Sequence, residues 1–110
     1  MSNTPYLSRS LESSDFGTIE LRITREDDEV PAFAYTIQNT DGRVDESFTA
    51  YGEDDVQALL FCLTAAGDYF ARFVPDASFV ELGITGLPVT ATRAEGEWRA
   101  EVVTPTVLPA

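Results

Sequence analysis

Apolar and polar side chains alternate along three segments in the first half of the chain, residues 16–24, 32–38 and 43–51. Alternation with a period of two is typical of a strand that is buried on one face. The connections between these segments are short, and short connections favour antiparallel pairing over parallel pairing. The pattern therefore predicts an antiparallel β-meander whose buried face carries Ile19, Leu21, Ile23, Phe33, Tyr35, Ile37, Val44, Phe48 and Ala50.

Residues 54–73 change to a helical period. Gly52 ends the preceding strand, and Asp54 or Asp55 is placed to cap the helix, with Gln57 returning a hydrogen bond to the first turn. One apolar stripe runs along this helix, and we expect it to lie on the sheet. Its members are Val56, Leu59, Leu60, Leu63, Gly67, Phe70 and Val74.

The opposite side of the same helix is also apolar, with Ala58, Phe61, Cys62, Ala65, Tyr69 and Phe73. A helix that is apolar nearly all round is buried on two sides. We expect a homodimer, with the candidate interface formed by Ala58, Phe61, Ala65 and Tyr69. The alternative is that a C-terminal hairpin with Trp98 and Val102 covers this side within one chain.

The remaining segments complete an α+β prediction. A further strand is expected at residues 78–82, and a C-terminal β-hairpin at residues 89–94 and 97–103, around Glu95 and Gly96. Residues 1–10 and 104–110 lack periodicity and are expected to be loosely ordered tails. The 110 residues are thus predicted to form a single domain, in which an antiparallel meander packs on one long helix.

The charge is strongly acidic, with 19 Asp and Glu against seven cations, all of them arginine, for a net charge of -12. A field of that sign repels phosphate backbones and anionic lipids and attracts basic protein surfaces. We therefore expect no direct binding to nucleic acid or membranes. The candidate acidic surface consists of Glu26, Asp27, Asp28, Glu29, Glu53, Asp54 and Asp55. These positions lack the spacing of an EF-hand loop, so no metal site is expected.

Missing residue types narrow the possible chemistry. The chain has no histidine and no lysine, which removes the commonest general base and the amine of Schiff-base chemistry. Cys62 stands alone, so an intrachain disulfide is impossible, and its apolar neighbours favour a buried, inert thiol. We expect no enzyme activity and no cofactor, and a cytoplasmic location in view of the lone cysteine and the lack of a signal or membrane-spanning pattern.

Residues 52–59, Gly-Glu-Asp-Asp-Val-Gln-Ala-Leu, resemble the G-x-D-x-x-Q-A-L helix start of a small bacterial family of uncharacterised proteins. Members of that family have leading β-strands, one amphipathic helix and a following strand near a G-x-P-like turn. In this sequence Gly86-Leu87-Pro88 occupies the position of that turn. The resemblance covers about residues 16–90 and implies this order of elements. It implies no catalytic role for any residue.

These observations favour a small acidic protein-interaction module that binds a basic protein partner, of accessory, immunity-like or inhibitor type. Two alternatives stay open. A small ligand could bind between helix and sheet in a pocket lined by Phe33, Tyr35, Phe61, Tyr69 and Phe70. Carboxylates arrayed at phosphate-like spacing could instead mimic a nucleic acid and block a DNA- or RNA-binding protein.

Overall fold

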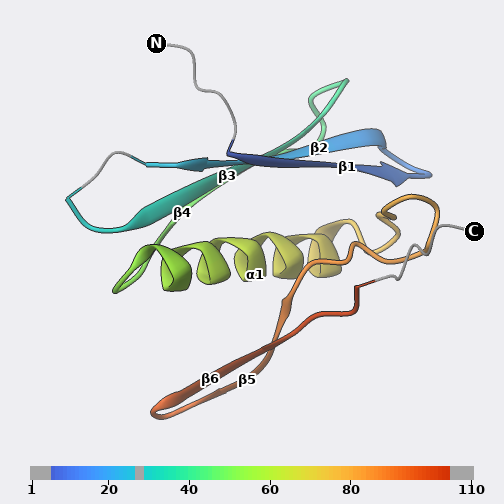
Figure 1. Cartoon of the computed structure of the whole chain (residues 1–110). Coiled ribbons are helices and arrows are strands. Elements are labelled where there is room, and N and C mark those ends of the chain that lie inside the picture. Colours follow the sequence, from blue (N-terminus) through green and yellow to red (C-terminus); the bar gives the residue numbers. More distant parts are fainter. Residues whose placement is uncertain (1–5, 27–28, 105–110) are drawn as a thin grey trace, which may run out of the picture.

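A four-stranded antiparallel sheet covers one side of a single helix, and a separate two-stranded hairpin lies on the other side (Figure 1). The computed structural model describes residues 6–26 and 29–104. The sheet has the order β1-β2-β3-β4, so the predicted α+β meander is confirmed, with one strand more than expected. No helix in the described ranges is long and apolar enough to cross a membrane. The elements are β1 (Leu7–Ser13), β2 (Gly17–Arg25), β3 (Ala32–Asn39), β4 (Asp45–Tyr51), α1 (Asp55–Phe73), β5 (Val89–Ala94) and β6 (Glu97–Glu101).

The additional strand is β1, which begins within residues 1–10, the segment that the sequence predicts to be a loose arm, and extends to Ser13. It pairs with β2 along its full length, from Leu7 opposite Ile23 to Ser13 opposite Gly17. Leu11 is the only large apolar side chain that β1 buries. One buried leucine among polar residues gives almost no alternation, which is why the pattern failed to indicate a strand. Residues 1–5 and 105–110 of the expected tails lie outside the described residues.

The strand predicted at residues 78–82 is reduced to one bridge between Ser78 and Glu12, whose backbone groups exchange two hydrogen bonds of 2.9 Å. The next residues turn away from an extended path, because Val80 and Glu81 both adopt positive φ angles, 45° and 62°. Left-handed backbone at two successive residues ends strand pairing. The segment therefore forms a folded loop that lies against β1.

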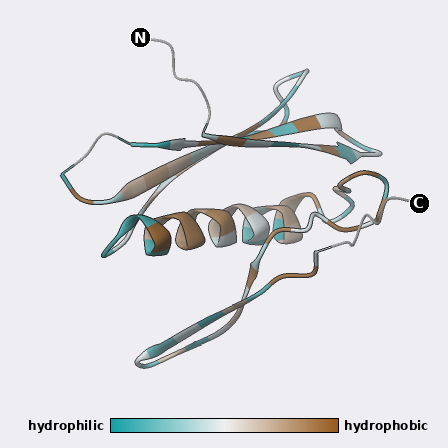
Figure 2. Cartoon of the chain, viewed as in Figure 1, coloured by the Kyte–Doolittle hydropathy of each residue, from teal (hydrophilic) through white to brown (hydrophobic). Residues whose placement is uncertain are grey.

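The helix packs on the sheet with a face that only partly matches the expected stripe, from which Phe70 and Val74 do enter the core. Ala58, Cys62, Ala66 and Phe70 are buried in the same cluster as the inner residues of β2 and β3. Val56 and Leu60 of the expected stripe are 66% and 48% exposed. The prediction was wrong because hydrophobic residues occupy most turns of α1 on both sides, so periodicity alone could not orient it (Figure 2). The small side chains of the buried line let the helix approach the rings of the sheet closely.

The C-terminal end of the helix is tied to the turn between β1 and β2. The Asp76 carboxylate accepts hydrogen bonds from the Ser13 hydroxyl at 2.9 Å and from the Ser14 N–H and hydroxyl, both at 2.8 Å. The hydroxyl and N–H of Ser14, followed by the Ser13 hydroxyl, hold the pKa of Asp76 below its usual value. Asp76 thus fixes β1 against the segment that follows α1.

We predict that Phe70→Ala costs about 3–5 kcal/mol of unfolding free energy, because its fully buried ring leaves a cavity. Val56→Ala, which the sequence pattern would have placed in the core, should change stability by less than about 0.5 kcal/mol. Urea unfolding of both variants checks this. Equal losses in the two variants would mean that the helix is oriented as the sequence pattern predicted.

Candidate functional site

The hairpin of β5 and β6 covers part of the second side of α1 within the same chain. The Trp98 ring meets the Phe61 ring edge to face, with 4.7 Å between centroids and 79° between planes. The Asp68 carboxylate accepts from the Thr90 N–H at 2.8 Å and from the Thr90 hydroxyl at 2.7 Å. The alternative left open by the sequence, a hairpin over this side, is therefore what the structure shows.

The four residues of the candidate dimer interface differ in their accessibility to a second subunit. Ala58 is fully buried beneath the turn from β4 to α1, so it cannot contact a second subunit. Phe61, Ala65 and Tyr69 are partly buried. Phe61 contacts Trp98 of the hairpin, while Tyr69 packs on Phe70 and on Phe73.

The base of the hairpin lies directly on the helix at Gly67. A Cβ atom at this position would stand 1.9 Å from the Pro88 carbonyl oxygen and 3.3 Å from the Leu87 Cβ. Glycine is therefore required by a close approach between two backbones. Together with the Asp68–Thr90 bonds, this contact sets where β5 starts.

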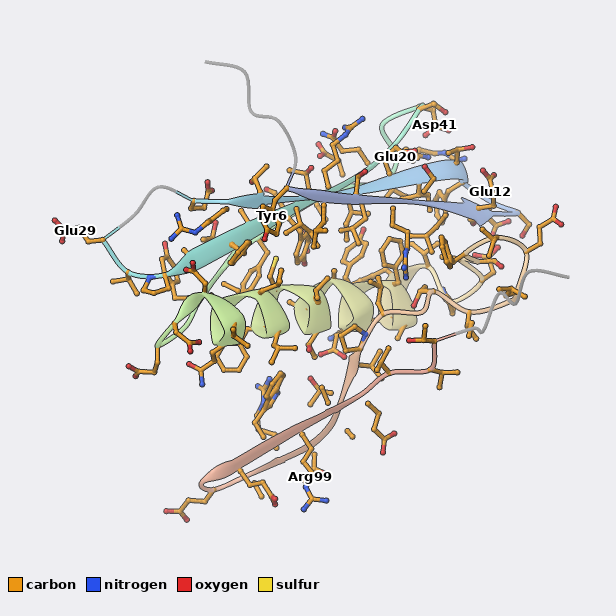
Figure 3. The ribbon with its side chains drawn as sticks, viewed as in Figure 1. Tyr6, Glu12, Glu20, Glu29, Asp41 and Arg99 are labelled. Atoms are coloured by element: carbon orange, nitrogen blue, oxygen red, sulfur yellow. The ribbon has the colours of Figure 1, made fainter. Side chains whose placement is uncertain are left out.

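Beyond its base the hairpin diverges from α1 (Figure 1) and leaves a groove of about 890 Å³ between β4, α1 and the hairpin. Arg99 points away from the helix (Figure 3), as the alternation of β6 requires when its neighbour Trp98 points toward it. Four of the lining residues are aromatic. The groove is lined by Phe48, Thr49, Ala50, Tyr51, Gln57, Phe61, Thr64, Ala65, Asp68, Thr90, Arg93, Ala94, Gly96, Glu97 and Trp98.

Carboxylates outnumber cations along this groove. Asp68 and Glu97 line it against Arg93, the single cation in the lining, and Glu97 is ion-paired with Arg99 at 2.9 Å. A smaller hollow of about 360 Å³ at the start of α1 shares Gln57, Phe61 and Trp98 with the groove and adds the carboxylates of Glu53 and Asp54. The two hollows thus form one aromatic surface with an acidic margin.

The start of β4 adds further negative charge. Glu46 lies on the inner face of the sheet, opposite Ile37, and is half-buried. Burial raises the pKa of the Tyr35 and Tyr69 phenols, and the negative charge of Glu46 raises both further. Asp45 contributes in the same direction at Tyr69. This end of the strand is therefore a site of negative potential.

The edge of the sheet beside the groove is open. β4 pairs with β3 on one side, and in the described residues no strand pairs with its other side, because β5 and β6 form a sheet of their own. The sequence pattern did not assign an open edge to this strand, although the last strand of a meander is an edge unless a later strand joins it. Edge strands expose backbone donors and acceptors to other chains.

The described residues of the candidate acidic surface lie in two separate segments, the start of α1 and the loop between β2 and β3. Asp54 caps α1, accepting from the Gln57 N–H, while the Gln57 side chain accepts from the Glu53 N–H, both at 2.8 Å. This reciprocal cap confirms the structural role that the sequence predicted for Asp54 and Gln57. Asp55 instead forms an ion pair with Arg25 at 3.1 Å.

Glu26 and Glu29 lie in the loop between β2 and β3, away from the groove lining, and Asp27 and Asp28 lie outside the described residues. Among the residues described, no three Asp, Glu or Cys side chains come together as metal ligands would.

The expected ligand pocket between helix and sheet is filled by side chains. Phe33, Tyr35 and Phe70 are buried members of the core cluster, with Phe61 and Tyr69 packed against it. These five aromatic side chains therefore serve mainly as packing rather than as the walls of one cavity.

Comparisons of this chain with protein-family models, with curated proteins and with solved structures found no match. The family resemblance of residues 52–59 stays a prediction.

We predict that Gly67→Ala destabilises the protein, although alanine favours a helix by about 1 kcal/mol over glycine. The added methyl group would push Pro88 and the hairpin base from α1. Thermal unfolding should show a lower midpoint, and the emission of Trp98 should shift to the red. Ala71→Gly, at an exposed helical site, is the control that loses about 1 kcal/mol from propensity alone. A Gly67→Ala protein more stable than the parent would contradict the close approach.

We also predict that thiol reagents leave Cys62 unlabelled in the native state. The side chain is fully buried, and burial raises the pKa of its thiol to about 12, so almost no thiolate exists at neutral pH. Mass spectrometry should find one modified cysteine only after denaturation. Ser47→Cys, at an exposed position, should add one rapidly labelled thiol to the native protein. Rapid labelling of the native parent would contradict the burial of Cys62.

Proposed function

We propose that this protein is a small acidic protein-interaction module that binds a segment of a basic protein partner in the groove between β4, α1 and the hairpin. The observation that carries the proposal is an aromatic groove that runs beside an open strand edge. An accessory, inhibitor-type or immunity-like protein would act in this way, by occupying a basic surface of another protein.

The aromatic side chains supply the apolar part of such an interface. Phe48 is 49% exposed on the inner face of β4, and Phe61 and Trp98 line the same groove from α1 and β6. Aromatic residues are enriched in interfaces, where a few of them contribute most of the binding energy. Large rings left exposed around one groove are costly unless another surface covers them.

The charge around the groove supports a basic partner. Asp68 brings a carboxylate to the groove and Glu46 brings one to the start of β4, and the whole chain carries a net charge of -12. Complementary charge speeds the encounter with a basic surface and suppresses acidic competitors. The same field opposes nucleic acids and a second acidic copy of this chain.

A peptide-binding measurement tests the proposal. Short synthetic peptides of equal length and equal apolar content, but rich in either Lys and Arg or Asp and Glu, are titrated by fluorescence anisotropy. We expect binding by basic peptides, and we expect Trp98→Ala and Phe48→Thr each to weaken it by about tenfold or more, as the loss of an aromatic anchor does. Phe73→Ala, which removes an exposed ring outside the groove, is the control and should bind like the parent.

Equal binding of acidic and basic peptides, or no binding of either, would reject a basic partner. Light scattering of the parent protein alone at high micromolar concentration tests the homodimer that the sequence analysis expects. A dimer that Trp98→Ala or Phe48→Thr dissociates would assign the groove to self-association instead.

A further inference from the structure

We propose that the bound segment adds to the sheet as a fifth strand, paired with β4 through backbone hydrogen bonds, and that every second side chain of this strand enters the groove. This inference rests on the proposed function and specifies how the partner is held. It requires that β4 present free backbone groups, that its inner side chains face the groove, and that the hairpin leave the edge accessible.

The backbone groups can be assigned from the two bonds that flank β4. The Asn39 N–H donates to the Val44 carbonyl at 3.2 Å, and the Gly52 N–H donates to the Pro31 carbonyl at 3.1 Å. In an antiparallel pair, bonded and non-bonded residue pairs alternate. Val44 and Gly52 are eight positions apart, so both bonds fit a single alternation along the strand.

This alternation divides β4 into two sets of residues. Glu46, Phe48 and Ala50 direct their N–H and C=O groups toward β3. The other set directs these groups toward the open edge, where the described structure gives their backbone no partner. That second set consists of Asp45, Ser47, Thr49 and Tyr51.

The two sets also differ in side-chain direction. The side chains of Glu46, Phe48 and Ala50 point to the inner face of the sheet, since they stand opposite Ile37, Tyr35 and Phe33 of the core. In an added strand, the residues beside this set would have their side chains on the same inner face, where Phe61 and Trp98 line the groove. Backbone pairing would thus provide affinity, and the groove would select the alternate side chains.

The acidic start of β4 sets a direction along the added strand. In the added strand, the residue beside Glu46 on the inner face and the residue beside Asp45 on the outer face are expected to be Lys or Arg. Opposite charges attract across neighbouring strands. The inner position beside Phe48 favours an apolar or aromatic side chain. The expected partner segment is therefore extended, with basic residues at one end and an apolar residue in the groove.

The two edges of the sheet differ in how far other segments cover them. The edge at β1 is partly occupied, because Glu12 exchanges backbone bonds with Ser78 and the Arg9 guanidinium donates to the Thr85 carbonyl at 2.9 Å. β4 carries no proline and no bulge, and in the part of the chain that the structure describes no such segment covers it. Natural proteins usually block an edge strand by one of these means or by charged side chains. The charges of β4, Asp45 and the inward-pointing Glu46, lie only at its start, so the edge from Ser47 to Tyr51 is left unblocked. An edge left unblocked beside an aromatic groove is suited to strand addition by a partner.

Hydrogen exchange tests the pairing with a basic peptide that binds in the anisotropy experiment. On addition of the peptide, the amides of Ser47 and Thr49 should exchange at least about tenfold more slowly, whereas the amides of Phe48 and Ala50 should change little, because they are bonded to β3 in the free protein. N-methylation of the peptide at alternate residues should weaken binding strongly in one register and weakly in the other.

A matched pair of variants provides a second test. Thr49→Pro removes an N–H that points to the open edge, which an edge strand tolerates, and should lower affinity by about tenfold or more. Thr49→Val retains the N–H and should lose much less affinity than Thr49→Pro. If Thr49→Pro fails to fold, the exchange and N-methylation measurements decide.

The outcomes separate this inference from the proposed function. Binding that depends on Trp98 but leaves the Ser47 and Thr49 amides unprotected overturns strand addition while the groove stays a binding site. The absence of binding by any basic peptide overturns both. Protection of Ser47 and Thr49 that grows with protein concentration alone would show that a second copy, rather than a basic partner, occupies the edge.

Discussion

The helix α1 is apolar on two sides, and this constraint determines how the rest of the chain is arranged. A sheet can bury only one side of a helix, so part of the other side needs a second layer. The hairpin supplies that layer from the same chain, held at its base by the close approach of Gly67 to Pro88 and further out by the contact of Trp98 with Phe61. The second side is therefore buried in part within one chain, while Val56, Leu60 and Phe73 stay exposed.

The same arrangement produces the groove. β5 and β6 are mainly hydrophilic toward their tip (Figure 2). Beyond their base they therefore have little apolar surface to bury against the helix. They pair with each other rather than with β4, which keeps one edge of the larger sheet open. Aromatic side chains from the strand, the helix and the hairpin then surround one hollow. The proposed interaction site is thus a consequence of covering the helix with a separate hairpin instead of extending the sheet.

Sequence patterns predicted the elements better than their contacts. Strands β2 and β3 alternate cleanly, and the cap at Asp54 has a clear signature, so both were found. Strand β1 was missed because it buries only Leu11 among its large side chains, and the orientation of α1 was missed because both of its sides are apolar. The groove depends on where the hairpin lies, which is set by a backbone contact at Gly67 that no periodicity records.

The attachment of Asp76 to Ser13 and Ser14 has a consequence for the order in which the protein is made. Chains leave the ribosome from the N-terminus, so the first strand of the sheet emerges long before the segment that protects it. Residues 76–85 hold and partly cover β1, through Asp76, Ser78 and Thr85, and they follow it by more than sixty positions. The nascent sheet consequently has two open edges until residues 76–85 have been made, and in the described part of the finished protein the edge at β4 stays open.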